Sequence, residues 1–331
     1  MTAERAADRE FDVVVIGGGA AGLSAALALV RARRTVLVVD SGEPRNARAA
    51  HVHNFLTREG TPPAELLRIG RGEVEDYGGT VVTDTVTKVE RLHDDESPYV
   101  AFELQLQSST AVSARRLVLA TGLVDQLPDI PGMADRWGRD VLHCPYCHGW
   151  EITDQRVGVL ATSPMAAHQA QMWRQWTDDV TLLVHTASEP SAEEIRALRA
   201  RGIAIRRGAV TSLDVSGDTL VGVRLDGGRT FALDALVVAP RFNARADLVH
   251  ALGVEATQLE MGGADWGTYV VVDPMGATSV AGIYAAGNVA DPMAQVVMAA
   301  GAGLRTGASV NMSLTDEEVV AAVRAAATSS P

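Results

Sequence analysis

The residues best suited to chemistry in this 331-residue chain are its only two cysteines, Cys144 and Cys147. Two residues separate them, and this spacing lets the two sulfurs meet as a strained, readily reduced disulfide. The thiolate is the reactive form of a cysteine, and a nearby cation or helix N-terminus lowers the pKa of the thiol. We therefore predict a dithiol/disulfide couple that exchanges electron pairs with a substrate.

Two histidines directly flank this pair, since His143 precedes Cys144 and His148 follows Cys147. A histidine takes or gives a proton near neutral pH, and thiol–disulfide exchange needs such proton transfers. Each histidine is therefore a candidate catalytic residue, and the alternative for each is an ordinary hydrogen-bonding role.

Two other readings of the cysteine pair are half of a zinc site and a structural staple. Zinc usually takes four ligands, often with a second cysteine pair, and the chain has no other cysteine. Ligation by both cysteines and both flanking histidines stays open, although the histidines directly adjoin the cysteines, unlike finger spacing. A disulfide that closes so short a loop gains little entropy. Redox chemistry is favoured, and no metal is expected.

Composition excludes several classes of protein. The chain has 41 acidic and 29 basic residues, a net charge of −12, which argues against a nucleic-acid partner. Residues 1–10 are polar and charged, unlike a secretory signal, and the apolar run 20–30 is too short to span a bilayer. We predict a soluble cytoplasmic protein with no membrane contact, where a Cys-x-x-Cys pair is more often catalytic than structural.

The N-terminal stretch has the pattern of a dinucleotide-binding βαβ unit. It contains, in order, a buried strand at 11–16, the motif Gly17-x-Gly19-x-x-Gly22, a helix to about 33, a strand at 36–39, and Asp40. Gly17 permits the tight turn, Gly19 lets a pyrophosphate approach the backbone, and Gly22 allows close helix packing. Asp40 lies 18 residues after Gly22, near the usual spacing for the acid that binds ribose hydroxyls.

A second strand-loop-helix-strand unit follows at residues 156–185, but it lacks the features that hold a dinucleotide. Its loop, residues 161–166, contains no glycine, so Cβ atoms obstruct the approach of a pyrophosphate. Residues 185–189, after its second strand, include no arginine for a 2′-phosphate. This unit is predicted to bind a nicotinamide dinucleotide poorly.

The C-terminal part begins with a strand that ends at Gly287 and the polar Asn288. An apolar helix rich in small residues is predicted from 292 to about 311, where it can lie tightly on a cofactor or a partner helix. The last 15 or so residues are predicted to form a solvated, alanine-rich helix and tail.

Four motifs make the chain resemble the low-molecular-weight thioredoxin-reductase-like flavoproteins over nearly its whole length. They are, in the family's order, Gly17-x-Gly19-x-x-Gly22, Ala120-Thr121-Gly122, Cys144-x-x-Cys147 and Ala285-Ala286-Gly287-Asn288. The resemblance implies an α/β fold with two Rossmann-like nucleotide-binding domains, and a homodimer. It implies a discontinuous FAD-binding domain, 1–123 and 247–331, around a central domain, 124–246, with the cysteine pair and a degenerate NADPH-type fold.

The resemblance also implies a set of FAD-binding residues. Asn288, where the family usually has aspartate, would hold the ribityl chain, while Gln295 and Val296 would present backbone to the flavin ring. The full set is Gly17, Gly19, Ala20, Ala21, Gly22, Asp40, Ser41, Arg45, His51, Val86, Ala120, Gly287, Asn288, Gln295 and Val296.

The Cys-Pro-Tyr-Cys-His-Gly stretch most resembles the FAD-dependent dithiol oxidases that close the disulfide of gliotoxin- and holomycin-type metabolites. It implies a small-molecule dithiol substrate and dioxygen as acceptor, with hydrogen peroxide as product. By the same resemblance, Cys144 is the outer sulfur and Cys147 the one nearer the flavin. His148 takes the place of the family's acid as first proton carrier, with His143 second.

The degraded second unit favours the same direction, because electrons that cannot enter from a nicotinamide must enter as thiols. Three alternatives stay open: an NADPH-dependent reductase, a reductase with another electron donor, and a non-catalytic flavin-bound redox sensor.

Overall fold

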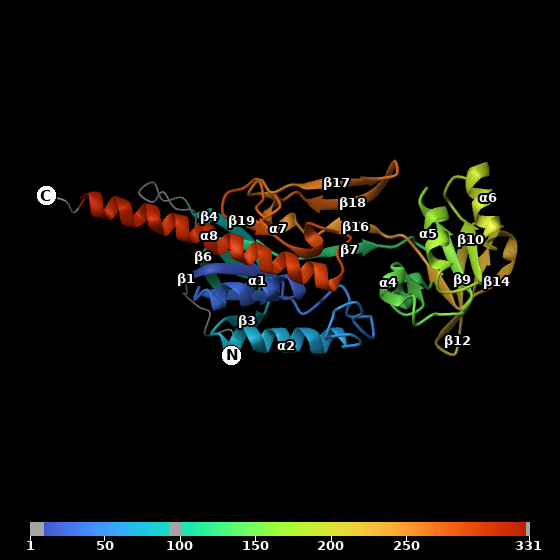
Figure 1. Cartoon of the computed structure of the whole chain (residues 1–331), viewed down its shortest axis with the longest axis horizontal. Coiled ribbons are helices and arrows are strands. Elements are labelled where there is room, and N and C mark those ends of the chain that lie inside the picture. The colour runs from blue at the N-terminus through green and yellow to red at the C-terminus, as the bar shows by residue number, and fades with distance from the viewer. Residues whose placement is uncertain (1–9, 93–100, 329–331) are drawn as a thin grey trace.

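The computed structural model describes residues 10–92 and 101–328, an α/β protein with two sheet-centred units along its long axis (Figure 1). The predicted α/β fold is confirmed. The prediction that the N-terminal segment is no secretory signal falls on residues 1–10, of which 1–9 lie outside the described residues.

The larger unit is built on a seven-stranded sheet with the order β3-β2-β1-β6-β5-β4, and β19 pairs with β6 at the branch. The strands are β1 (Glu10–Ile16), β2 (Val36–Asp40), β3 (Thr80–Thr83), β4 (Val86–Leu92), β5 (Ala101–Leu106), β6 (Ala111–Leu119) and β19 (Ile283–Ala285). Its helices are α1 (Ala20–Arg31), α2 (Pro63–Asp76), α7 (Asp247–His250), the 3-10 turn η3 (Gly287–Val289) and α8 (Val296–Thr328). We call this the seven-stranded unit.

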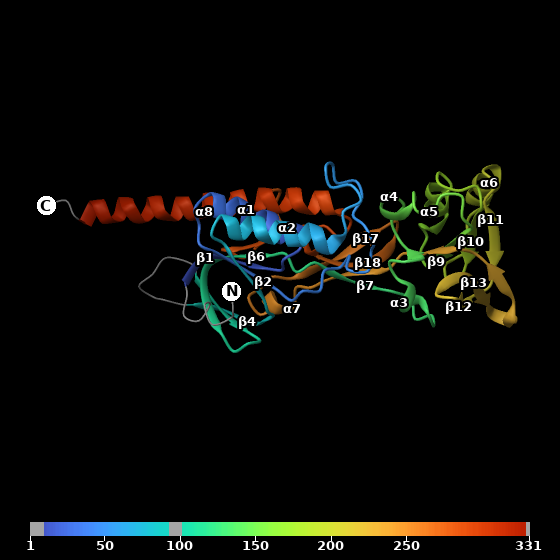
Figure 2. The ribbon, with the colours of Figure 1, turned by 90° about the horizontal axis from the view of Figure 1, so that it is seen from below.

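Buried strands and small residues hold this unit together. Val13, Val14 and Val15 of β1 are fully buried, as expected for a parallel strand covered on both faces. Figure 2 shows α1, α2 and α8 as a layer over the sheet. A Cβ at Gly303 of α8 would lie 2.0 Å from the carbonyl oxygen of Ala21, so glycine lets α8 touch α1. This packing brings the start of α8 to the turn before α1.

Helix α8 corrects the predicted C-terminus. It is one continuous helix of 33 residues that begins at Val296, rather than a helix from 292 to about 311 with a separate tail helix. Its second half is held by ion pairs, since Arg115 and Arg116 of β6 approach Glu317 at 2.7 and 2.8 Å. These partners are far away in sequence, so no local pattern predicts them. The end of α8 projects beyond the sheet (Figure 1).

The smaller unit is built on a parallel sheet with the order β11-β10-β9-β15-β8, and we call it the five-stranded unit. Its elements are α3 (Met133–Arg136), β8 (Val141–Leu142), α4 (Pro145–His148), β9 (Val157–Ala161), α5 (Ala166–Trp173), β10 (Val180–Val184), α6 (Ala192–Ala200), β11 (Ala204–Arg207) and β15 (Ala235–Val237). An antiparallel sheet covers it, formed by β12 (Val210–Ser216), β13 (Thr219–Leu225), the 3-10 turn η2 (Asp226–Gly228) and β14 (Thr230–Ala232).

Two antiparallel strands connect the units, β7 (Leu123–Gln126) and β16 (Arg241–Ala244). They join β17 (Ala256–Met261) and β18 (Ala264–Val270) in a four-stranded sheet with the order β17-β18-β16-β7. In Figure 1 the β17–β18 hairpin reaches toward the five-stranded unit. The predicted domain boundaries, 123/124 and 246/247, fall close to the connecting strands and stay a prediction.

Candidate active site

The glycine turn between β1 and α1 forms an open cradle. Gly17 has a φ of 108°, and a Cβ there would lie 2.3 Å from the carbonyl oxygen of Ala120. A Cβ at Gly22 would lie 1.9 Å from the oxygen of Gly17, so the chain itself requires both glycines. Gly19 differs, because its φ is −77° and a Cβ would meet no heavy atom within 4 Å. The free space lies at the N-terminus of α1, which starts at Ala20, and it suits a pyrophosphate.

Asp40 lies at the end of β2, as predicted, and its buried carboxylate faces this turn. A Cβ at Gly18 would lie 2.7 Å from the Asp40 side chain. The carboxylate also pairs with Arg71 of α2, a partner that the sequence analysis missed because no motif links the two positions. The next predicted residue, Ser41, is exposed at the same edge of the sheet.

Asn288 organises the loop that leads into α8. Its side-chain amide donates hydrogen bonds to the carbonyl oxygens of Asp291 at 3.0 Å, Pro292 at 3.4 Å and Ala294 at 2.9 Å. An aspartate has no N–H to donate and would place a charge against three carbonyl oxygens. This explains why asparagine is compatible with the loop where the family usually has aspartate.

Five further residues of the predicted cofactor site lie in different places. Ala21, Ala120 and Gly287 come together at the turn, and a Cβ at Gly287 would lie 2.7 Å from the Cβ of Ala21. Val86 is instead buried in the core at the start of β4, and His51 is exposed at the surface. The cofactor contacts of Val86 and His51 stay predictions.

Arg45 links the segment after β2 to both connecting strands. Its guanidinium donates to the carboxylate of Asp125 at 2.6 and 2.8 Å and lies 5.2 Å from the centre of the Phe242 ring. This engaged cation is close enough to lower the pKa of the Cys147 thiol, although other influences on that thiol are larger.

The cysteine pair sits on the short helix α4, with Cys144 as its N-cap. Pro145 occupies the first helical position, where a missing N–H costs nothing, and the backbone N–H of Cys147 donates to the oxygen of Cys144 at 3.1 Å. Both cysteines are free thiols and half-buried. Figure 1 shows α4 on the side of the five-stranded unit that faces the larger unit.

The two thiols differ in acidity. The thiol of Cys147 donates to the sulfur of Cys144 and, against the effect of burial, lowers the pKa of Cys144 to about 7. The backbone N–H groups of Cys147 and Tyr146 add to this, as does the side-chain amide of Gln295, 4.0 Å away. The pKa of Cys147 is raised, first by the same bond to Cys144. The reduced pair therefore holds its thiolate on Cys144 near neutral pH.

Both flanking histidines are held neutral by burial. Burial lowers the pKa of His148, and its Nδ1 is buried with no hydrogen-bond partner among the described residues. His143 is also buried, which lowers its pKa, and its Nδ1 lies 3.0 Å from the carbonyl oxygen of Val238. A neutral imidazole accepts a proton, so both fit the role of base better than that of a cation beside Cys144.

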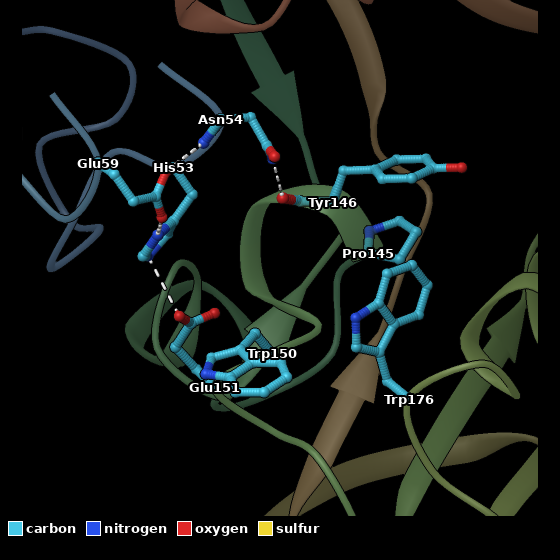
Figure 3. A pocket seen from close by; sticks show the side chains of 8 residues that line it. All are labelled: His53, Asn54, Glu59, Pro145, Tyr146, Trp150, Glu151 and Trp176. Carbon is cyan, nitrogen blue, oxygen red and sulfur yellow. Dashed lines mark hydrogen bonds and ion pairs between the residues drawn. The ribbon is translucent and has the colours of Figure 1, made fainter. Parts of the chain in front are cut away.

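A pocket of about 450 Å³ lies beside α4, at the meeting of the two units. Figure 3 shows its lining residues, which are His53, Asn54, Glu59, Pro145, Tyr146, Trp150, Glu151 and Trp176. The sequence analysis missed this pocket, because its walls come from segments that are distant in the chain. The one local signal was a tryptophan two residues after His148.

Hydrogen bonds and ion pairs join the two walls of the pocket. His53 lies between two carboxylates, with Nδ1 2.5 Å from Glu59 and Nε2 3.2 Å from Glu151. The side-chain amide of Asn54 donates to the carbonyl oxygen of Tyr146 at 2.6 Å (Figure 3). The larger unit thus contacts the helix that carries both sulfurs.

Aromatic rings supply the apolar part of the pocket. Tyr146 and Trp150 are 57% and 79% exposed, and the Tyr146 ring meets the Trp176 ring edge to face at 5.8 Å. A Cβ at Gly149 would lie 2.7 Å from the Trp176 ring, so glycine lets this ring lie against the end of α4. Exposed rings beside a reactive helix are available to contact a ligand.

The loop of the second dinucleotide unit, between β9 and α5, is filled by a side chain. Met165 is partly buried and packs against the apolar cluster of Leu123, Phe242 and Trp266, the last of which lies on β18 of the β17–β18 hairpin. Its sulfur would lie 3.0 Å from a Cβ at Gly262, at the tip of that hairpin. A dinucleotide would need a loop without side chains here, but in this protein the loop carries Met165, which contacts the other unit.

The polar residues of the segment after β10 make contacts within the protein. His185 accepts the backbone N–H of Val210 at 2.9 Å, and Glu189 pairs with Arg207 at 2.8 Å. The Arg207 guanidinium is therefore already paired with a carboxylate of this segment. That this unit binds a nicotinamide dinucleotide poorly stays a prediction.

The expectations of no metal ion and no membrane contact stay predictions. Within residues 10–92 and 101–328, no group of three or more histidine, cysteine, aspartate or glutamate side chains is placed to hold a metal ion. No helix in the same part of the chain is both long and apolar enough to cross a membrane.

Comparisons with known proteins agree with this geometry. Residues 11–303 match the pyridine nucleotide-disulphide oxidoreductase family. The thioredoxin reductase sirT of Leptosphaeria maculans is 31% identical over 325 residues, which cover 94% of this chain and 96% of sirT. The crystal structure of HlmI superposes with a TM-score of 0.87 at 47% identity, covering 96% of this chain and 97% of HlmI. A putative thioredoxin reductase TrxB from Bacillus anthracis gives 0.83 at 28% identity, covering 93% of this chain and 99% of TrxB.

The cofactor that the family implies fits the residues present. The space above Gly19, the buried Asp40 and the Asn288 loop converge at the turn between β1 and α1, where FAD would be held. The free cysteine pair approaches the same unit through Gln295. The similarity extends over nearly the whole chain and includes the glycine turn and the cysteine pair. This chain therefore belongs to the pyridine nucleotide-disulphide oxidoreductase family, as a thioredoxin-reductase-like, FAD-binding flavoprotein.

Proposed function

We propose that this protein is a dithiol oxidase, which closes a disulfide in a small-molecule dithiol and passes the two electrons through FAD to dioxygen. The observation that carries the proposal is the packing of Met165 in the loop where a nicotinamide dinucleotide would bind. Without that donor, electrons enter as substrate thiols. The resemblance of the Cys-Pro-Tyr-Cys-His-Gly stretch to gliotoxin- and holomycin-type dithiol oxidases supports the same direction.

The cycle begins with the enzyme disulfide between Cys144 and Cys147. A substrate thiolate attacks Sγ of Cys144, which forms a mixed disulfide and releases Cys147, and Cys147 takes up a proton because its pKa is raised. The second substrate thiol then attacks the substrate sulfur of the mixed disulfide, which closes the product disulfide and releases Cys144. Cys144 is a good leaving group because its pKa is about 7.

Bound FAD supplies the two-electron acceptor for the reduced pair and the route to dioxygen. One dithiol and one dioxygen thus become one disulfide and one hydrogen peroxide, since both are two-electron changes. His148 is the first base of the exchange, because its buried Nδ1 has no hydrogen-bond partner in the described chain and is free to take a proton. His143 is the second base, through the ring nitrogen that does not face Val238.

The second candidate is an NADPH-dependent reductase, because the relative sirT is named a thioredoxin reductase. Mixing the yellow holoenzyme anaerobically with NADPH, and separately with a small dithiol, distinguishes the two. Bleaching of the flavin by the dithiol but not by NADPH supports the oxidase, and peroxide should then appear on admission of air. Rapid bleaching by NADPH would support the reductase. Stoichiometric reduction by dithiol without turnover in air would support a redox sensor instead.

A further inference from the structure

We propose that the pocket beside α4 holds the sulfur-free part of the substrate and selects uncharged or cationic dithiols over anionic ones. This rests on the proposed function, because a selective pocket needs a dithiol to select. Pro145 and Tyr146 lie between the two cysteines and form one wall of the pocket. A dithiol that reacts at Cys144 therefore places its remaining atoms next to these residues.

The charge of the lining supports this selectivity. Glu59 and Glu151 contribute two carboxylates, and His53 between them is the one group in the lining able to become cationic. The lining therefore carries one net negative charge with His53 protonated and two with it neutral. The hydrogen bond from His53, followed by the backbone N–H of Asn54, lowers the pKa of Glu59, so Glu59 is ionised at neutral pH.

No arginine or lysine is among the lining residues, and neither Arg45 nor Arg58, which precedes Glu59 in the chain, belongs to the lining. Arg45 is held in a two-bond ion pair by Asp125 and lies over the Phe242 ring. An anionic substrate would thus meet like charge with no free partner among the lining residues. An uncharged or cationic one would not.

The rings of the pocket indicate what else is recognised. Tyr146 and Trp150 are among the most exposed large apolar side chains, and Trp176 stands at a right angle to Tyr146. Flat or apolar groups pack well on such faces, and cations are attracted to them. Carboxylates and ring faces therefore favour the same ligands, which are apolar, amide-bearing or positively charged.

The test compares dihydrolipoamide with dihydrolipoate, dithiols that differ in an amide against a carboxylate. Peroxide production by the holoenzyme gives kcat/KM for each. Quenching of tryptophan fluorescence gives the dissociation constants of the oxidised forms, lipoamide and lipoate, without turnover. We expect the amide to be favoured about tenfold in both measurements at low salt, since like charges a few ångströms apart repel at that scale. Added salt should shrink the ratio, because it screens exposed charges.

Variants locate the selectivity. In the double variant Glu59→Gln/Glu151→Gln the ratio should fall to about twofold or less, because the pocket loses its negative charge. The matched control Glu65→Gln/Glu189→Gln removes two exposed carboxylates outside the pocket and should keep the wild-type ratio. If loss of the His53–Glu151 contact disturbs folding, the salt dependence of the wild type still tests the charge effect.

Two results overturn the proposal: equal binding of lipoamide and lipoate by the wild type, or a ratio unchanged by the double variant. The proposed oxidase function fails separately. Preferential binding of lipoamide with no peroxide from either dithiol would remove the oxidase reaction and leave the selectivity supported.

Discussion

The side-chain amide of Gln295 lies 4.0 Å from the sulfur of Cys144 and joins the start of α8 to the N-cap of α4. The sulfur that carries the thiolate therefore faces the element expected to line the flavin. The resemblance assigns Cys147, not Cys144, to the flavin side, and that assignment stays a prediction. The contact also affects reactivity, because the amide contributes to the lowered pKa of Cys144.

Alkylation of the reduced enzyme should report this lowered pKa. Because the thiolate is the reactive form, labelling of Cys144 by iodoacetamide should be half-maximal near pH 7, which is about the pKa of its thiol. Gln295→Leu removes an N–H from the thiolate and should move the midpoint upward, whereas Gln175→Leu, at an exposed site, should not. A wild-type midpoint near that of a free cysteine, about 8.5, would contradict the assignment.

Single cysteine variants should separate the roles of the two sulfurs. Cys144→Ser and Cys147→Ser should both abolish turnover, since each removes the disulfide. With the neutral reagent 2-hydroxyethyl disulfide at pH 7, Cys147→Ser should form a mixed disulfide on Cys144 about fivefold faster than Cys144→Ser does on Cys147. Mass spectrometry measures both rates. Faster reaction at Cys147 than at Cys144 would mean that Cys147 is the sulfur attacked by the substrate.

Substitution of Gly19 should remove FAD without unfolding the chain. The backbone there has a φ of −77°, which valine accepts, and the added side chain would enter only the space assigned to the pyrophosphate. Gly19→Val should therefore purify nearly colourless with near-normal circular dichroism. The control Gly72→Val also points into open space, but on α2, and should stay yellow. A fully flavinated Gly19→Val protein would show that the cofactor lies elsewhere.

Loss of His148 should affect proton transfer rather than cofactor binding. His148→Ala should lower kcat about a hundredfold and keep its FAD, while His168→Ala at an exposed site should change little. Burial holds the pKa of His148 below its ordinary value of 6.5, so the neutral base is present at pH 7 and is lost as pH falls below that pKa. The wild-type rate should decline in that acidic range. If His148→Ala shows the same decline of rate at acidic pH as the wild type, another group is responsible for that decline.

Replacing Asn288 by the aspartate that is usual in the family should lower the stability of the fold and the affinity for FAD. Asn288→Asp replaces an N–H donor to three carbonyl oxygens by a carboxylate, at a cost of about 2 kcal/mol. Thermal unfolding should show a lower Tm, and FAD titration a weaker Kd. The matched control is Asn311→Asp, because the Asn311 oxygen already accepts from Arg34 at 2.8 Å. A tighter Kd in Asn288→Asp would show that the loop prefers the acid.

Local patterns accounted for most of the cofactor-binding half of the fold. The apolar run of β1, the three glycines and Asp40 lie within one βαβ unit, so their spacing predicts their geometry. The short helix α4 was not predicted, although the cysteine pair was. A four-residue helix leaves almost no periodic signal, and tertiary contacts maintain it.

The features that sequence reasoning missed all depend on distant partners. Arg71 of α2 pairs with Asp40. Glu317 pairs with Arg115 of β6, and this contact stabilises α8 beyond the end that the sequence predicted. The pocket joins His53 of one unit to Glu151 of the other. Such pairs follow from how the units pack, and no propensity or spacing within either segment encodes them.

The contact of Met165 with the β17–β18 hairpin determines which substitutions this loop tolerates. A phosphate-binding loop is constrained by ligand charge and by bare backbone, whereas this one is constrained by the volume of a partly buried side chain. Leucine or isoleucine at position 165 would preserve the contact, whereas glycine, the residue that a nucleotide would require, would open a cavity between the units. A nicotinamide site at this loop would thus first require a step that loosens the contact between the units, and this cost is a barrier to acquiring such a site.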